Sequence, residues 1–204
     1  MTLDFVFQIA ILIMSIVVHE VAHGYAALFL GDQTAKYEGR LTLNPLKHLD
    51  PVGSFLVPLM SYTLGGFIIG WARPVPYNPY NLRPGRWSEA MVAGAGPLSN
   101  IAIALIFGLI LRGSLVAGAN PAFIEITSLI IFINIILAVF NLVPVPPLDG
   151  SKLLFALFPE KLMQFRAFFE RYGILLLILF VFFVWQLIFP VVVFIFQLIT
   201  GIVL

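Results

Sequence analysis

Residues 5–30 read FVFQIAILIMSIVVHEVAHGYAALFL, and this stretch decides which kind of fold the chain can adopt. It is apolar except around His19. As a helix at about 1.5 Å per residue, it is long enough to cross a bilayer core of about 30 Å. The first Lys or Arg of the chain is Lys36, so the stretch lacks the positive flank of a removable signal peptide. We therefore expect a membrane-spanning helix here.

The composition of the whole chain supports a membrane protein. Of its 204 residues, 61% are hydrophobic and 10% are charged, whereas soluble domains carry about 45–50% apolar and about 25% charged residues. This excess excludes an ordinary soluble enzyme, a nucleic-acid-binding protein and a disordered chain. The chain has no Cys, which excludes disulfides and thiolate metal sites. We expect the lipid bilayer, and no nucleic acid, as a partner.

Hydrophobic segments outline the predicted architecture. The apolar stretches are Phe5–Leu30, Pro51–Gly70, Ser88–Leu111, Pro121–Val143 and Gly173–Val203. They predict about five to six membrane segments, because the last stretch is long enough for either one kinked span or two elements. Alternating residues over 36–43 predict a short strand pair. The expected fold is an all-α polytopic membrane protein with a small membrane-associated β element, forming a single domain over residues 1–204.

The positions of the basic residues predict the topology. All of them except Arg112 lie in three segments, at 36–47, 73–86 and 152–171. The positive-inside rule assigns such segments to the cytoplasmic side of the cell membrane. The Pro51–Gly70 stretch would then enter and leave on one side as a re-entrant hairpin, with the N-terminus outside. The alternative is that this stretch simply spans the membrane.

The chemistry of the chain is indicated by His19-Glu20-Val21-Ala22-His23, an H-E-x-x-H motif on the first predicted helix. Two His residues four positions apart project from one helix face and can bind one metal ion. Glu20 is placed to take a proton from water at that metal. Zinc is the metal that suits His nitrogen in such a site, so the sequence predicts one Zn²⁺ per chain.

A catalytic zinc site needs a third protein ligand, for which the sequence offers three candidates. Asp149 ends a Pro-rich elbow, residues 144–150, whose prolines and final Gly would hold one carboxylate rigidly. His48 lies in a polar turn sequence, where we expect an exposed loop residue. Glu125 is the weakest of the three candidates. We favour Asp149 over His48.

The chain resembles the site-2 protease family of intramembrane zinc metalloproteases, and specifically its short bacterial members without soluble domains. The resemblance rests on the H-E-x-x-H sequence within an apolar helix and on the segment 141–150, which reads NLVPVPPLDG. Segments 44–51 and 95–100 also look like parts of that family. Together these motifs identify residues 5–160 as the expected catalytic core, followed by a C-terminal hydrophobic segment over 173–203.

This resemblance implies a set of site residues. Zinc would be held by His19, His23 and Asp149, with Glu20 as the general base and the metal nearer the cytoplasmic face. Asn141 matches an Asn that lies near the metal in that family. Its amide would hold the scissile strand or stabilise the oxyanion, although an Asn that merely ends a helix is an equal alternative.

The predicted function is that of an intramembrane zinc metalloendopeptidase that cleaves transmembrane protein substrates within or near their spans. The alternative is a non-hydrolytic membrane protein that binds or transports zinc. A transporter should carry ionisable residues along a path through several helices, whereas here they gather at one level. Gly65-Gly66 and residues 37–43 provide either an edge strand for unwound substrate or an ordinary connecting loop. We expect Asn100 to be structural. The sequence gives neither the substrate nor the oligomeric state.

Overall fold

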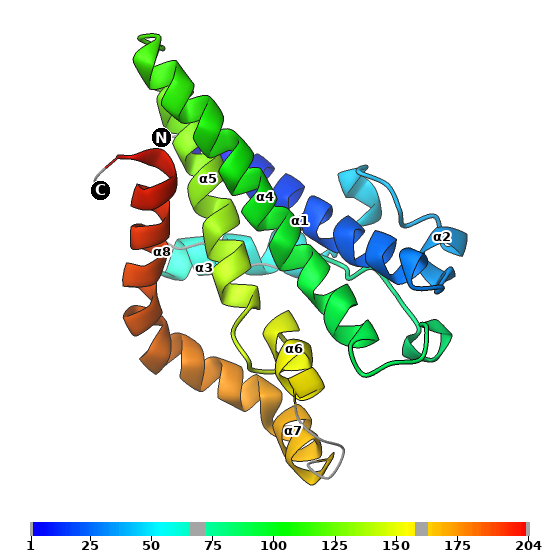
Figure 1. Cartoon of the computed structure of the whole chain (residues 1–204). Coiled ribbons are helices and arrows are strands. Elements are labelled where there is room, and N and C mark those ends of the chain that lie inside the picture. Colours follow the sequence, from blue (N-terminus) through cyan, green and yellow to red (C-terminus); the bar gives the residue numbers. More distant parts are fainter. Residues whose placement is uncertain (1, 66–71, 158–162, 203–204) are drawn as a thin grey trace. The chain divides into compact units, whose positions relative to one another are not determined.

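The computed structural model describes residues 2–65, 72–157 and 163–202, and this part of the chain is helical with no strand. The chain forms two compact units, residues Met1–Arg83 and Pro84–Leu204. The first unit contains α1, α2 and α3, and the second contains α4 to α8 (Figure 1).

The first unit is built on the long apolar helix α1 (Thr2–Phe29), which agrees with the span predicted over residues 5–30. Its buried face includes Ser15, His19, His23 and Ala27, which follow one another at intervals of four residues. Residues at this spacing lie on one side of a helix. The H-E-x-x-H motif therefore lies on a buried stripe of α1.

The strand pair predicted over residues 36–43 is wrong for this segment. Its first residues belong to the short helix α2 (Thr34–Tyr37), and the chain then turns at Gly39, whose φ is +63°. The Arg40 N–H donates to the Ala35 carbonyl at 2.9 Å. These bonds are local, so the backbone groups that a strand would offer to a partner are used within one turn. Of the Gly pair in the edge-strand hypothesis, Gly65 is the last described residue of a helix and Gly66 lies outside the described residues.

The stretch predicted to re-enter the membrane begins with a π-helical turn (Val52–Leu56) and continues as α3 (Val57–Gly65). Within the described residues, its apolar helical part is shorter than the roughly 20 residues that a span needs. The two flanks of the stretch meet, because the Arg73 N–H donates to the His48 carbonyl at 2.8 Å. A segment whose ends meet in this way enters and leaves at one level, which favours the re-entrant alternative.

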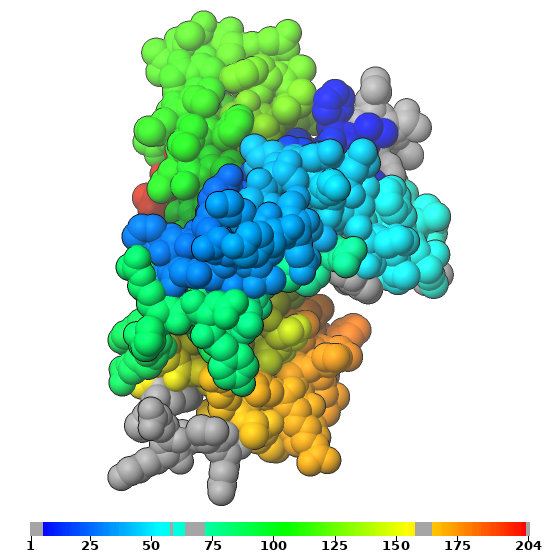
Figure 2. All heavy atoms as spheres, turned by 90° about the vertical axis from the view of Figure 1, so that its right-hand side faces the viewer, coloured from blue at the N-terminus to red at the C-terminus, as the bar shows by residue number. Residues whose placement is uncertain are grey.

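The second unit has α4 (Ser88–Val116) and α5 (Pro121–Asn141) as an antiparallel pair (Figure 1). In the space-filling view, the green and yellow-green atoms of these helices form one continuous block (Figure 2). The Asn100 Nδ2 donates to the Asn134 Oδ1 at 2.8 Å, and both side chains are fully buried. This amide pair links the two helices away from water, which supports the structural role expected for Asn100.

The remaining helices are α6 (Asp149–Leu157), α7 (Met163–Leu179) and α8 (Trp185–Thr200). A π-helical turn, Phe180–Val184, joins the last two helices without a break. The C-terminal segment is therefore one long helix that changes direction in its orange-to-red part (Figure 1), and π turns are a known cause of such bends. This helix packs on α4 and α5 around a buried apolar core, which consists of Ala104, Leu111, Ile131, Ile135, Val192 and Phe196.

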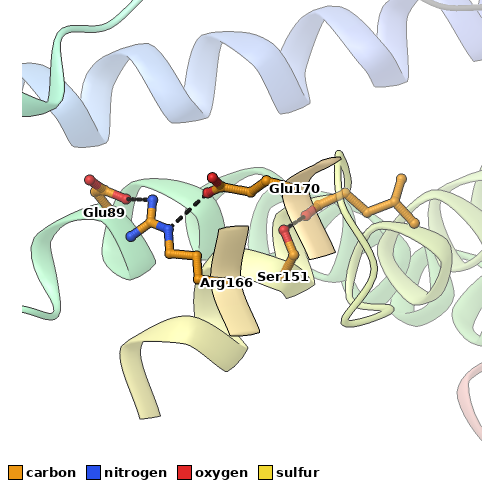
Figure 3. Close-up of polar contacts among 5 residues, drawn as sticks. Glu89, Ser151, Arg166 and Glu170 are labelled. Carbon is orange, nitrogen blue, oxygen red and sulfur yellow. Dashed lines mark hydrogen bonds and ion pairs between the residues drawn. The ribbon is translucent and has the colours of Figure 1, made fainter. Parts of the chain in front are cut away.

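Two sets of polar contacts secure the ends of helices in this unit. The Arg112 guanidinium donates to the carbonyls of Leu198 and Ile199, at 2.6 and 2.8 Å, and so satisfies the C-terminal end of α8. On α7, Arg166 lies between two carboxylates, with Glu89 at 3.4 Å and Glu170 at 2.8 Å (Figure 3). Because this cluster is half exposed to solvent, each pair contributes only about 0–1 kcal/mol.

Four helices in the described part of the chain are long and apolar enough to cross a membrane. They are Val6–Phe29, Ser88–Val116, Pro121–Asn141 and Phe165–Thr200. The chain is thus a multi-pass membrane protein. The predicted number of five to six segments is not confirmed: the described part of the α3 region is too short to count as a span, and the described C-terminal stretch is one continuous helix.

Candidate metal centre

Two imidazoles converge on the buried face of α1. The Nε2 atoms of His19 and His23 lie 3.0 Å apart, and the rings meet edge to face with centroids 4.6 Å apart. Two nitrogens bound to one tetrahedral zinc, each at about 2.0–2.1 Å, would be about 3.3 Å apart. The pair therefore fits two positions of such an ion with little movement. Both side chains are buried, with exposed fractions of 5% and 9%.

Glu20 is held by a backbone amide from a distant part of unit 1. The Val75 N–H donates to the Glu20 Oε2 at 2.8 Å. Within the described part of the chain, the other carboxylate oxygen, Oε1, accepts no hydrogen bond. One oxygen of the predicted general base is thus fixed, while the second is available for a proton.

Val75 belongs to an extended segment, residues 72–78, that we call the strap. The guanidinium Nη2 of Arg40 donates to the carbonyls of Arg73 and Pro74, at 2.8 and 3.2 Å. Burial lowers the pKa of this guanidinium from its ordinary value, and the charge of Arg73 lowers that pKa further. Arg40 remains a cation, because an arginine guanidinium is not deprotonated in proteins.

The far end of the strap is tied to Asp32, which is almost completely buried. This carboxylate accepts four hydrogen bonds, from the amide and hydroxyl of Thr34, the Asn81 side chain and the Asn78 N–H. Burial alone would raise the pKa of Asp32, but the hydrogen bonds outweigh it and leave the pKa below its ordinary value. The strap is therefore bound at both ends to the region that follows α1.

The sequence predicted that His48 is an exposed loop residue, and this is wrong. The side chain is completely buried. Its Nε2 lies 2.8 Å from the Thr42 carbonyl, which can only accept, so this nitrogen carries the proton. The Nδ1 is buried and has no partner among the described residues. His48 thus uses one nitrogen to fix the loop around it.

Asp149 is the first residue of α6 and is buried, with an exposed fraction of 8%. The elbow before it turns tightly through hydrogen bonds from the Val145 N–H to the Val143 carbonyl and from the Leu148 N–H to the Val145 carbonyl, at 2.8 and 2.9 Å. The Ser151 hydroxyl donates to the Leu148 carbonyl at 2.7 Å (Figure 3). These hydrogen bonds fix the backbone conformation before and after Asp149.

Glycines allow the elbow to pack closely within unit 2. A Cβ on Gly150 would collide with the backbone of Leu142 and Val143. A Cβ on Gly173, in α7, would lie 2.8 Å from the Pro146 carbonyl oxygen. Both contacts are with backbone atoms, which cannot rotate away. The elbow that carries Asp149 is therefore packed from two directions.

The other candidate residues lie at the two ends of α5. Asn141 is the last residue of this helix, and its Nδ2 donates to the Leu137 carbonyl at 2.9 Å. Glu125 lies near the N-terminal end of the same helix and is exposed. The length of α5 separates these two residues, so within unit 2 the structure associates only Asn141 with the elbow that follows it.

Sequence reasoning missed the residues that hold Glu20. Arg40 and Val75 lie in stretches that the sequence presents as a loop and a Pro-rich connection. One feature of the sequence, the pattern RPVPYNP over residues 73–79, partly indicated the strap. Alternating prolines favour an extended backbone and remove some of its N–H groups.

Comparisons with known proteins give a consistent family. The model of Peptidase family M50 matches residues 113–184. The chain is 41% identical over 177 residues to “Putative zinc metalloprotease YwhC” of Bacillus subtilis (strain 168), which covers 83% of this chain and 78% of that protein. It is 33% identical over 146 residues to “Putative zinc metalloprotease Rip2” of Mycolicibacterium smegmatis, which covers 72% of this chain and 55% of that protein. No solved structure gives a significant match.

The chain belongs to Peptidase family M50, the site-2 protease family that its motifs resemble. It is a zinc metalloprotease, as the sequence predicted. Its family and its apolar helices place it in a lipid environment.

Proposed function

We propose that the chain is an intramembrane zinc metalloendopeptidase that hydrolyses peptide bonds within or near transmembrane segments of other membrane proteins. The observation that carries this proposal is the buried pair His19 and His23, whose Nε2 atoms converge in an apolar helix of spanning length. Water-soluble peptides are excluded from the interior of a bilayer. A site on such a helix therefore meets peptide bonds that are themselves in the membrane.

In this proposal, His19, His23 and Asp149 hold one zinc ion. Two imidazole nitrogens and one carboxylate oxygen are a donor set that fits a metal ion, and all three side chains are buried. Three protein ligands leave a fourth position of a tetrahedral zinc open, which is the arrangement of catalytic sites. When bound, the zinc would supply a Lewis acid for the peptide carbonyl.

Glu20 would carry out the proton transfers. Its free oxygen, Oε1, would accept a proton from the attacking water and then deliver it to the leaving nitrogen. The Asn141 amide would stabilise the developing oxyanion if it left the Leu137 carbonyl. The alternative role of Asn141, ending α5, requires no such movement.

The placement in the cell also belongs to the proposal. The basic segments around Lys47, Arg83 and Lys152 indicate that the active site faces the cytoplasmic side of the cell membrane. We further propose that residues 1–204 act as a single protease domain, with its catalytic core over 5–160.

The test combines zinc content with cleavage of a membrane-spanning peptide by the purified protein. Wild type should hold one zinc per chain and cleave, while Glu20→Gln should keep the zinc and lose at least about 10²–10⁴-fold in rate, because Gln accepts no proton. Glu38→Gln, a change at an exposed carboxylate of the same unit, is the matched control and should cleave normally. Cleavage by Glu20→Gln near the wild-type rate would contradict the proposal. A zinc-loaded wild type that cleaves no membrane span would favour the non-hydrolytic alternative.

A further inference from the structure

The strap has an unusual pattern of backbone donors. Two of its seven residues, Pro74 and Pro76, have no N–H. Three of its other amides donate to partners within unit 1: Arg73 to the His48 carbonyl, Val75 to Glu20 and Asn78 to Asp32. The segment is thus held as an extended chain without belonging to a sheet.

Close packing brings the strap directly against α1 beside the histidines. A Cβ on Gly24 would lie 2.9 Å from a Val75 methyl carbon and 2.5 Å from a Leu41 methyl carbon. With a larger residue after His23, the Leu41 and Val75 side chains would have to shift away from α1. The Val75 side chain is buried, with an exposed fraction of 5%, so the amide that meets Glu20 is fixed by packing as well.

Arg40 donates hydrogen bonds to two backbone carbonyls of the strap, next to the amide that meets Glu20. It is buried, with an exposed fraction of 6%, and its Nη2 bridges the two carbonyls that directly precede Val75. Its Nε has no partner in the described part of the chain. Burying a guanidinium without a bonded carboxylate costs folding free energy. A buried Arg of this kind therefore indicates a role other than solubility or charge pairing.

We propose that Arg40 is a positioning residue for Glu20: it holds the Arg73 and Pro74 carbonyls so that the Val75 amide meets the Glu20 carboxylate. This inference rests on the proposed function in one respect, that Glu20 is the general base. The bond from Val75 restricts the rotamers of a long side chain and leaves Oε1 in a defined place. Correct placement of a catalytic group is worth up to about 10²-fold in rate per ångström of error.

The first arm of the test needs no substrate. Hydrogen–deuterium exchange of the purified protein, resolved to single amides across residues 72–78, reports the strap directly. Arg40→Met should speed exchange at Arg73 and Val75 by about tenfold, while Asn78, which Asp32 holds, should keep its rate. Glu20→Ala should release only the Val75 amide. Unchanged Val75 exchange in both variants would overturn the inference, whatever the enzyme does.

The second arm measures kinetics on a synthetic transmembrane peptide that wild type cleaves. Arg40→Met should keep its zinc and its KM but lose about 10–10²-fold in kcat, and Arg40→Lys should recover part of that loss. Lys36→Met, which removes an exposed charge from the same unit, is the control and should behave as wild type. In a Glu20→Asp background the shorter carboxylate no longer reaches Val75, so Arg40→Met should cost much less.

Three results would contradict the positioning role. The first is a wild-type kcat in Arg40→Met, and the second is an equal loss of kcat in the Glu20→Asp background. The third is a loss of zinc together with activity in both Arg40 variants, which would make Arg40 a structural residue only. If wild type cleaves no peptide, the proposed function fails, and the exchange arm still decides whether Arg40 holds the strap.

Discussion

Two carboxylates of unit 1 are held in contrasting ways. Asp32 accepts four hydrogen bonds, which use both of its oxygens. Glu20 accepts one, and its Oε1 is available. A carboxylate with every acceptor position used stabilises the fold around it, whereas one with an available oxygen can take part in proton transfer. The same side-chain chemistry thus supports structure at one position and reactivity at the other.

The metal ligands are predicted to respond differently from His48. His19→Ala, His23→Ala and Asp149→Ala should each lose bound zinc, because removing one of three ligands leaves too few donors. His48→Ala should retain it, because the His48 Nε2 is bound to the Thr42 carbonyl. Zinc content of the purified variants, by elemental analysis, checks this. An empty site in His48→Ala with a full site in Asp149→Ala would show that the third ligand has been misassigned.

Asp32 is predicted to make the stability of the protein sensitive to acid. Its pKa in the folded state lies below its ordinary value, so its contribution is complete above the unfolded pKa of about 3.9 and is lost as the pH falls through the folded pKa. Thermal unfolding in detergent between about pH 6 and about pH 3 measures the effect. Asp32→Asn should be destabilised by about 1–3 kcal/mol at neutral pH. The side-chain NH2 group of Asn would face hydrogen-bond donors and could not accept from them. Asp32→Asn should also lose less stability on acidification than Glu38→Gln does.

At the scale of elements, the packing of the elbow and α6 depends on one glycine, which has no side chain. Gly150 lies against the backbone of Leu142 and Val143, so the first turn of α6 folds back on the end of α5. This contact determines where the preceding residue, Asp149, is carried. The elbow is therefore a rigid connection, and its backbone conformation sets the position of Asp149, the proposed metal ligand.

Gly150→Ala should displace the elbow. The added Cβ meets backbone atoms that cannot rotate away, so the change should cost about 1–3 kcal/mol in stability and about 10²-fold in proteolytic rate. Gly113→Ala, in α4, is the matched control, because a Cβ there meets nothing within 4 Å. Thermal unfolding and peptide cleavage of both variants provide the measurement. Equal behaviour of the two alanine variants would contradict the packing argument.

The long helices were predictable from sequence, and the loops were not. The predicted starts of α4 and α5 at Ser88 and Pro121 agree with the structure, because uninterrupted apolar runs leave a membrane chain few alternatives. The burial of Arg40 and His48 was missed, because it depends on contacts with a strap more than 20 residues away. The false strand pair arose because eight alternating residues are also compatible with a helical turn and a Gly-directed reversal.

For the whole molecule, the meeting of His48 and Arg73 constrains the path of the chain through the bilayer. Since the two backbones are hydrogen-bonded, we expect the residues on either side of the α3 region to lie on one side of the membrane. By the positive-inside rule, we expect the basic residues around them to face the cytoplasm. The loop between α4 and α5 should then lie outside.

Single Cys substitutions test this topology cleanly, because the chain has no Cys. Lys47→Cys and Arg83→Cys should react with a membrane-impermeant maleimide only after the cells are permeabilised. Ala117→Cys, at an exposed position after α4, should react in intact cells. Labelling of Arg83→Cys, but not Lys47→Cys, from outside would mean that the α3 region crosses the membrane.

The continuous helix from Phe165 to Thr200 has a consequence for bilayer thickness. Its 36 residues extend about 54 Å at about 1.5 Å per residue, whereas a hydrocarbon core measures about 30 Å. Hydrophobic mismatch of this size is relieved by tilting, bending or placing part of the helix among the lipid headgroups. The bend near Phe180–Val184 divides the length into two arms. A change in the angle between those arms would let the same helix fit thinner or thicker membranes, at a cost of only fractions of a kcal/mol per ångström.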